Sequence, residues 1–432
     1  MAAWLKTSDP NFEDRFKALL AQKREQAADV DDKVAAIIGQ VRAEGDKALV
    51  DLTLAYDGLD LRKIGIRVTP GEIEAARAKV DQKTLAALKL AHDRILDHHQ
   101  RQLPKDDLYR DALGVELGQR WTPVASAGLY VPGGTASYPS SVLMNALPAK
   151  VAGVPRIAMV VPALQGALNP LVLVAAELAG VSEIYRVGGA QAIAALAYGT
   201  KSIPPVVKIV GPGNAYVAAA KRQVFGQVGI DMVAGPSEVV VIADRDNDPA
   251  WIASDLLAQA EHDSAAQAIL ITDHEDFARA VADAVEAELA VLPRAEIARA
   301  SWREFGAVIL VKSLDEAPAL ADRLAPEHLE IATRDADALA ARIHDAGAIF
   351  IGRYTPEVIG DYVAGTNHVL PTARSARFAS GLGVLDFMKR SSILKLDADA
   401  LAALGPSAMI LAEAEGLDAH RRSVAIRLNR RD

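Results

Sequence analysis

Residues 238–273, EVVVIADRDNDPAWIASDLLAQAEHDSAAQAILITD, carry a strand, a helix and a second strand in succession. EVVVIAD and AILITD are short runs rich in β-branched and other apolar residues, and a polar turn follows each of them. Between them, WIASDLLAQAEH repeats its apolar residues at helical spacing. This order predicts a βαβ unit, in which the two strands are parallel.

The same alternation extends through most of the chain after residue 150. Further candidate strands are RIAMVVP (156–162), EIYRVG (183–188), VVKIV (206–210), GAVILV (306–311), LEIAT (329–333) and GAIFIG (347–352). Helical patterns lie between them, and the first hundred residues also show helical spacing. We therefore predict an α/β fold with two Rossmann-like α/β domains, mainly parallel sheets, and small helical N-terminal and C-terminal segments.

Two clusters of glycine and proline divide the chain, at 128–141 and at 233–239. The segment between them has its own strands and helices, which indicates an inserted domain with the clusters as hinges. The predicted parts are an N-terminal helical segment (1–28), a first α/β domain (29–127 with 240–375), an inserted second α/β domain (128–239) and a C-terminal segment (376–432). The C-terminal segment is too small to fold alone, so we expect it to pack on something else.

Composition excludes several functions. The 432 residues include 47 Lys and Arg against 56 Asp and Glu, a net charge of −9, and no basic run with interleaved aromatic residues appears. The start, MAAWLKTSDPNFEDRF, has no signal-peptide pattern, and no apolar run approaches about 18 residues. We expect a cytoplasmic protein with no nucleic acid and no membrane among its partners.

The chain contains no cysteine. This excludes disulfides, thiolate metal ligands and a cysteine nucleophile. Any chemistry must use His, Asp, Glu, Ser, Lys, Tyr or a bound ion.

The stretch LAPEHLEI (324–331) places two proton-handling side chains, Glu327 and His328, next to each other. Neighbours point to opposite faces in a strand, so only a turn or the start of a strand can aim both at one site. Pro326 favours an extended Ala325 and an irregular backbone at this point. The alternative is a strand entry with two solvated polar residues.

Several His, Asp and Gln side chains form a candidate metal site. Gln259 and His262 lie three residues apart on one helix face, and nitrogen and oxygen atoms are the ligands left when sulfur is absent. The other fragments are Asp361 and His368 in VIGDYVAGTNHV, and Glu415 with His420 in EAEGLDAHRRS. The alternative for Gln259 and His262 is a surface pair at a helix end. We expect the remaining histidines on solvated surfaces: 92, 98, 99, 274 and 344.

A nucleotide site is suggested by KIVGPGNAYVAAAKR (208–222), a strand, a Gly-x-Gly turn and a helix that starts at Asn214. The dinucleotide fingerprint is not satisfied, because Tyr216 stands at its sixth position and Pro212 between the glycines. A plain tight turn therefore remains an alternative. RVGGAQAIAALAYG (186–199) repeats the pattern, with Gln191 at the helix start.

Seven motifs occur in a fixed order between about residues 128 and 371: YVPGG, VGGAQAIAALAYGT, KIVGPGNAYV, DMVAGPSEV, LLAQAEHD, LAPEHLEI and GTNHVLPT. In order and spacing they resemble the histidinol dehydrogenase family, and both ends of the chain also fit. The resemblance implies a zinc-dependent, NAD-linked enzyme. Such an enzyme oxidises L-histidinol through L-histidinaldehyde to L-histidine, the last reaction of histidine biosynthesis.

The resemblance also implies residue roles. Zinc, one ion per subunit, would be bound by Gln259, His262, Asp361 and His420, and Glu327 and His328 would be the catalytic acid–base pair. Substrate would contact Ser237, Glu415, the zinc ligands and the catalytic pair, and NAD would contact Tyr130, Gln191 and Asn214. The family forms an intertwined homodimer, so 376–432 would be a dimerisation arm that carries Glu415 and His420 into the partner's site.

Without cysteine, the second oxidation must pass through the aldehyde hydrate, so Glu327 would activate water and His328 would accept protons. The imperfect glycine turns imply weak NAD binding. Three other functions remain open: a zinc hydrolase with Glu327 as base, a non-catalytic two-lobed binding protein, and a relative that oxidises another amino alcohol or a sulfonated diol.

Overall fold

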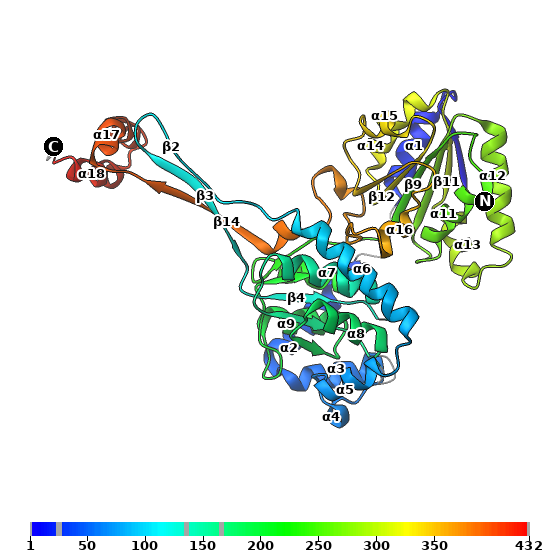
Figure 1. The fold of residues 1–432 in the computed structure, drawn as a ribbon, viewed down its shortest axis with the longest axis horizontal. Coiled ribbons are helices and arrows are strands. Elements are labelled where there is room, and N and C mark those ends of the chain that lie inside the picture. The colour runs from blue at the N-terminus through cyan, green and yellow to red at the C-terminus, as the bar shows by residue number, and fades with distance from the viewer. Residues whose placement is uncertain (1, 23–27, 134–137, 164–167, 430–432) are drawn as a thin grey trace. The chain divides into compact units, whose positions relative to one another are not determined.

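The structure, a computed structural model, describes residues 2–22, 28–133, 138–163 and 168–429. Its contacts divide the chain into two compact units (Figure 1). The first consists of Met1–Gln102 and Ala125–Phe387, and the second of Leu103–Val124 and Met388–Asp432. Over the described residues, no helix has both the length and the apolar character that crossing a membrane requires.

The first unit contains a parallel six-stranded sheet with the order β1-β11-β10-β9-β12-β13. Its strands are β1 (Ala3–Lys6), β9 (Glu238–Ala243), β10 (Gln267–Thr272), β11 (Ala307–Leu310), β12 (His328–Ala332) and β13 (Ala348–Ile351). Alternate residues of β9 face opposite sides: Val239 and Val241 enter one apolar core, and Val240 and Ile242 the other. Both faces are therefore covered by helices, as parallel sheets require.

The helices lie in two layers around this sheet (Figure 1). One face is covered by α11 (Pro249–Ala260), α12 (Glu275–Glu288) and α13 (Ala295–Glu304). The other is covered by α1 (Phe12–Ala21), α14 (Ala317–Leu324) and α15 (Ala336–Ala340). The short elements α16 (Glu357–Tyr362), η2 (Leu314–Glu316), η3 (Ser375–Arg377) and η4 (Val384–Phe387) lie in the connections of this unit.

The first unit also contains a parallel five-stranded sheet with the order β6-β5-β4-β7-β8. Its strands are β4 (Ala127–Tyr130), β5 (Ile157–Val160), β6 (Glu183–Tyr185), β7 (Lys208–Val210) and β8 (Gly229–Ile230). In the five-stranded sheet the chain places β5 and β6 on one side of β4 and then β7 and β8 on its other side. In the six-stranded sheet, β10 and β11 likewise lie on one side of β9, and β12 and β13 lie on the other. This leaves a topological switch point between β9 and β12 and another between β4 and β7.

Helices cover both faces of the five-stranded sheet as well (Figure 1). One layer contains α2 (Ala28–Glu44), α3 (Asp46–Asp57), α9 (Gly189–Tyr198) and α10 (Ala215–Val224). The other contains α6 (Gln82–Gln100), α7 (Pro139–Val151) and α8 (Pro170–Ala179), with α5 (Pro70–Arg77) against α8. The short helix α4 (Leu61–Ile64) follows α3.

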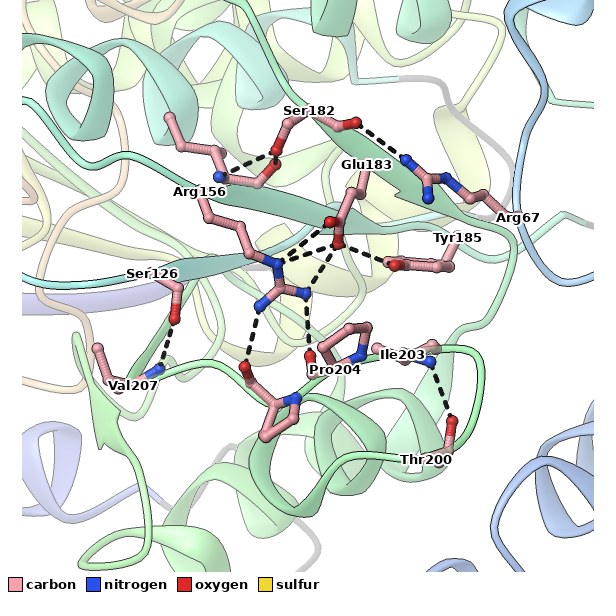
Figure 2. Close-up of polar contacts among 12 residues, drawn as sticks. Arg67, Ser126, Arg156, Ser182, Glu183, Tyr185, Thr200, Ile203, Pro204 and Val207 are labelled. Atoms are coloured by element: carbon pink, nitrogen blue, oxygen red, sulfur yellow. Dashed lines mark hydrogen bonds and ion pairs between the residues drawn. The ribbon is translucent and has the colours of Figure 1, made fainter.

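A polar network closes one end of the five-stranded sheet (Figure 2). The Arg156 guanidinium donates hydrogen bonds to the Glu183 carboxylate and to the carbonyl oxygens of Pro204 and Pro205. Tyr185 donates to the same carboxylate at 2.8 Å. The network thereby ties β5 and β6 to the chain that enters β7.

The second unit contains an antiparallel three-stranded sheet with the order β14-β3-β2. Its strands are β2 (Asp107–Arg110), β3 (Glu116–Pro123) and β14 (Met388–Lys395). Two helices that pack on each other complete it, α17 (Ala398–Ala414) and α18 (Asp418–Arg427).

The predicted α/β fold with parallel sheets is confirmed, but the predicted division of the chain differs from the structure. Helices α2 and α3 pack with the five-stranded sheet instead of with 240–375. Helix α6 packs on α7 and also contacts the loop at 363–367. An amphipathic pattern shows which helix face is apolar, and it does not show which sheet covers that face. The N-terminal segment, predicted as helical, also contributes strand β1.

The boundary of the C-terminal segment also differs. Residues 103–124 belong with 388–432, because β3 pairs along its whole length with β14. The predicted boundary at 128 lies one residue after β4 begins, and the boundary at 239 lies inside the start of β9. Residues 134–137 of the first predicted hinge lie outside the described residues.

Candidate active site

A cavity of about 150 Å³ gathers side chains from several elements of the first unit. Gly211 and Asp231, which follow β7 and β8, line one side of it. The predicted site residues that line it are Ser237, His262, Glu327, His328 and Asp361. Ligands of open α/β sheets usually bind beyond the carboxyl ends of the strands. The five-stranded sheet follows this rule, whereas the six-stranded sheet contributes the amino ends of β9 and β12.

The backbone before β12 differs from the prediction. Ala325 is left-handed, with φ 45° and ψ 58°, and it caps α14 through a hydrogen bond from its N–H to the Ala321 oxygen. We expected an extended Ala325, because the residue before proline avoids the right-handed helical region. The left-handed region also avoids the right-handed helical region, and it lets α14 end at Leu324, two residues before Pro326.

Glu327 and His328 are both directed at Glu238, the first residue of β9. The Glu327 carboxylate accepts a hydrogen bond from the Glu238 backbone N–H at 3.0 Å. The His328 Nδ1 atom lies 3.2 Å from the Glu238 carbonyl oxygen. A neutral His328 that donates from Nδ1 leaves Nε2 free to accept a proton. The predicted orientation of both side chains toward one site is therefore what the structure has, and both are buried.

His328 is surrounded by carboxylates. Its Nδ1 lies 3.6 Å from Glu357 and 3.8 Å from Glu327, and its Nε2 lies 3.5 Å from Asp361. Burial lowers the pKa of His328, but the charges of these three carboxylates outweigh burial and raise the pKa to about 10. Positive charge held at Asp361 would oppose this effect and bring the pKa back toward its ordinary range.

Gln259, His262 and Asp361 have properties that suit a divalent cation. Gln259 is fully buried, and among the described residues its Oε1 atom has no hydrogen-bond partner, while its Nε2 lies 3.3 Å from His262 Nδ1. Although His262 is an exposed residue, desolvation of its side chain lowers its pKa against the attraction of Asp361, which favours the neutral, ligating form. Burial raises the pKa of Asp361, but the neighbouring His328 outweighs it and lowers the pKa, so the carboxylate is ionised. The nitrogen and oxygen atoms of these three side chains are therefore suitable for the zinc-binding role predicted for them.

His420 and Glu415 belong to the second unit, where both are exposed. Within the described ranges, no three His, Asp or Glu side chains are arranged as an assembled metal site. One of the predicted ligands is a glutamine, and another is in the second unit. The contribution of His420 and Glu415 therefore stays a prediction.

Three carboxyl groups beside the site, of which Glu330 and Glu357 are buried and Asp255 is half-buried, were not predicted from the sequence. Asp255 on α11, Glu330 in β12 and Glu357 at the start of α16 lie close together, and Glu330 accepts the Glu357 backbone N–H at 2.5 Å. Burial raises the pKa of Asp255 to about 6 and that of Glu357 to about 8, and it raises the pKa of Glu330 well above its usual value. Glu330 stands at an inward position of a buried strand, which is the one pattern that could have marked it.

The loop that follows Asp361 is held by histidines. The His368 Nε2 lies 3.1 Å from the Ser141 hydroxyl, and its Nδ1 lies 3.0 Å from the Asp361 carbonyl oxygen. Asn367 Nδ2 lies 3.3 Å from the Nε2 of His99, which is fully buried. The predicted solvated position of His99 is therefore wrong, because its helix face packs against this loop.

The predicted cofactor residues lie at the carboxyl edge of the five-stranded sheet. The Tyr130 hydroxyl accepts the Gly189 backbone N–H at 3.1 Å, and both Tyr130 and Gln191 are buried. Asn214 is exposed and caps α10 by accepting the N–H groups of Tyr216 and Val217. None of the three lines the cavity, although Gly211 and Pro212 of the same turn do.

Comparison with known proteins agrees with this geometry. A family model described as histidinol dehydrogenase matches residues 20–428. A histidinol dehydrogenase from Brucella suis is 68% identical over 429 residues, covering 99% of this chain and 100% of that protein. The chain belongs to the histidinol dehydrogenase family. A histidinol dehydrogenase from Rhizobium meliloti is also 68% identical, covering 99% of each chain.

The fold comparison extends across the whole chain. The crystal structure of histidinol dehydrogenase from Elizabethkingia anophelis has a TM-score of 0.94 and 36% identity, covering 99% of this chain and 98% of that one. Histidinol dehydrogenases are oxidoreductases that catalyse the last step of histidine biosynthesis. The family predicted from the motifs is thus confirmed.

Proposed function

We propose that this chain oxidises L-histidinol to L-histidine with NAD, in a zinc-dependent, four-electron reaction through L-histidinaldehyde and its hydrate. The observation that carries the proposal is the arrangement of Glu327 and His328, which face one cavity beside His262 and Asp361. Family membership supports the reaction class.

The reaction requires two hydrides to leave one carbon and one oxygen to come from water. NAD, when bound, accepts the hydrides in turn. Because the chain has no cysteine, the aldehyde cannot be held as a thiohemiacetal, and the second hydride leaves from the hydrate. The side chains must therefore remove protons from the alcohol, from the water and from the hydrate.

Glu327 and His328 divide this proton transfer. Nε2 of neutral His328 accepts the proton of the alcohol, gives it to the aldehyde oxygen when water adds, and is then neutral again to accept the proton of the hydrate. The Glu327 carboxylate takes the proton of the water that attacks the aldehyde. Since both side chains are held by the same residue, Glu238, they can serve one carbon without a change in the backbone.

The proposed zinc ligands are Gln259, His262, Asp361 and His420. When bound, the ion would hold the imidazole and amine nitrogens of the substrate and so orient its alcohol group. Glu415 would pair with the substrate amine, and the Ser237 hydroxyl would contact the substrate in the cavity. The orphaned amide oxygen of Gln259 supports this assignment.

NAD is proposed to bind at the carboxyl edge of the five-stranded sheet, with contacts to Tyr130, Gln191 and Asn214. The switch point between β4 and β7 and the start of α10 support this position. The turn lacks the dinucleotide fingerprint, so we expect weak NAD binding in the absence of substrate.

The second unit is the proposed dimerisation arm of a homodimer. It leaves large apolar side chains exposed, among them Leu394 at 65%, Ile410 at 67% and Ile426 at 72%. An apolar surface of this kind on a small unit favours burial against another subunit. His420 and Glu415, on the same unit, would then complete the partner's site. We propose the cytoplasm, where NAD and the amino-acid pool are available, as the location.

The test is the amount of NADH formed from a limiting amount of L-histidinol at mildly alkaline pH, with and without a zinc chelator. We expect two NADH for each L-histidinol, and loss of turnover on chelation that added zinc restores. A histidinol-free reaction and a chelator already saturated with zinc serve as controls.

Each other outcome points to a different correction. One NADH for each substrate means that the reaction stops at the aldehyde, so Glu327 does not activate water. If no NADH forms, the next candidates are oxidation of another amino alcohol or a sulfonated diol and, after that, a zinc hydrolase. Turnover that survives complete removal of zinc contradicts the metal assignment.

A further inference from the structure

An ion pair between Lys221 and Asp231 is buried beside the cavity. Lys221 lies on α10 and Asp231 directly after β8, and their side chains are 2% and 1% exposed. The Lys221 ammonium contacts one oxygen of Asp231 and donates to the Gly211 carbonyl oxygen at 2.9 Å. The other oxygen of Asp231 accepts the Gly211 backbone N–H at 2.8 Å. The pair therefore holds both polar groups of the Gly211 backbone.

Gly211 occupies a position that only glycine can take. Its φ is +110°, and a Cβ atom there would lie 2.2 Å from the carbonyl oxygen of Tyr130, the last residue of β4. The turn continues through Pro212 and Gly213 to Asn214, which caps α10. Gly211 thus lies directly after β7, beside the carboxyl end of β4. Gly211, Pro212 and Asp231 also line the cavity.

Stability alone gives little reason for this pair. Removing two charges from water costs more than their attraction usually returns, and apolar residues of similar size would serve the fold as well. The Arg156–Glu183 pair of the same sheet (Figure 2) keeps more contact with water, with side chains 22% and 17% exposed. The more deeply buried pair is also the one that borders the cavity.

We propose that Lys221 and Asp231 are positioning residues for the nicotinamide cofactor. By holding the N–H and carbonyl of Gly211, they set the path of the Gly211–Asn214 turn and with it the surface that the cofactor meets. Neither side chain takes part in the chemistry. The inference rests on the proposed function, because it assumes that NAD binds at this edge of the sheet.

The test uses full-length, zinc-loaded enzyme and the variants Lys221→Met, Asp231→Asn and the double variant that combines them. Lys221→Met leaves the Asp231 charge buried without its partner, so we expect the melting temperature to fall by at least about 5 °C. In the double variant no charge remains buried, so the melting temperature returns toward that of the wild type. The KM for NAD stays raised by about tenfold in both, because the Gly211 carbonyl has lost its donor.

A positioning role is distinguished from a purely structural one if the melting temperature recovers in the double variant while the KM for NAD stays raised. The KM for L-histidinol should change by less than about twofold in the double variant. The matched control is Arg156→Met with Glu183→Gln, which removes an ion pair from the same sheet away from the cavity. This control should leave the KM for NAD unchanged.

The inference is overturned if the KM for NAD returns together with the melting temperature in the double variant, if the control raises the KM for NAD equally, or if both substrates lose affinity alike. If Lys221→Met does not fold, the double variant, which has no unpaired charge, still decides between these results. Wild-type enzyme that forms no NADH from L-histidinol removes the proposed function and the inference with it. Active wild-type enzyme with an unchanged KM in the variants overturns the inference alone.

Discussion

Glu327, His328, His262 and Asp361 line one cavity, and the roles proposed for them differ. His328 lies near carboxylates on both sides of its ring, and their charges raise its pKa. Strongly shifted pKa values are typical of functional sites. His262 has a lowered pKa and lies beside Gln259, whose amide oxygen has no hydrogen-bond partner among the described residues, and both properties suit metal ligands. The pKa values of the two histidines in this cavity are thus shifted in opposite directions, because their neighbouring groups differ.

This difference predicts that loss of activity and loss of bound zinc can be separated by mutation. Changing His328 to Asn should lower kcat by about 10²–10⁴-fold, because a general base is lost, while the zinc content stays near that of the wild type. Changing His262 to Asn should lower both the zinc content and kcat, because a ligand is lost. Metal analysis and NADH formation on the two variants check this. Loss of zinc from both variants would contradict the division of roles.

Helix α11, strand β12 and helix α16 meet through the carboxyl groups of Asp255, Glu330 and Glu357. Each of the three elements forms from its own local sequence pattern, but their packing brings the three carboxyl groups together. The pKa values of all three are raised, so the folded chain keeps them protonated to a higher pH than the unfolded chain does. Burial raises the pKa of Asp255 to about 6, above its ordinary value of 3.8. The folded state therefore keeps this proton over a range of pH in which the unfolded chain has released it.

The stability that Asp255 contributes should therefore depend on pH. It is complete below about pH 4, and it is lost as the pH rises through about 6. We expect the free energy of unfolding, measured with urea on zinc-free protein, to fall less between these values in Asp255→Asn than in the wild type. The exposed residue Asp283 provides the control, since Asp283→Asn should follow the wild-type curve. Parallel curves for all three proteins would refute the assignment.

At the scale of the whole molecule, the first unit contains the cavity with Glu327 and His328. Several large apolar side chains of the second unit are exposed to solvent in the single chain, among them Leu394, Ile410 and Ile426. A subunit interface would bury those side chains and would deliver His420. Sharing a site across subunits makes activity depend on assembly, which can be tested without structural data.

Changing Ile410 and Ile426 together to lysine should convert a dimer to a monomer and abolish activity, because two charges would enter the proposed apolar interface. Light scattering during size-exclusion chromatography measures the mass. Val291, which is 75% exposed in the first unit, provides the control, since Val291→Lys should leave the dimer intact. A double variant that is both dimeric and active would exclude this surface as the interface.

Mixing two inactive variants tests the shared site itself. After denaturation and joint refolding, His420→Asn and His328→Asn chains should recover about a quarter of wild-type activity, because half of the dimers are mixed and each mixed dimer has one intact site. If each chain used its own His420, no site would be intact. No recovery, with mixed dimers shown to be present, would therefore place His420 in the site of its own chain.

Much of the architecture could be predicted because hydrophobic spacing is a local property. The strands that contain Val239 and Ile269 are apolar at most successive positions, since both faces of a parallel sheet are covered. Glu327 and His328 were found because they stand together in one short stretch. Strands β1, β3 and β14 escaped prediction, since their pairing depends on partners far away in the chain.

The residues alone decided that the chain forms parallel α/β sheets, belongs to its family and carries Glu327 and His328 next to each other at the start of β12. Those properties follow from side-chain periodicity and from motifs of consecutive residues. Tertiary structure decided which sheet α2 and α3 cover, that Asp255, Glu330 and Glu357 meet, and that Lys221 and Asp231 hold Gly211. These features depend on burial and on charges brought together from distant positions, and no local pattern records them.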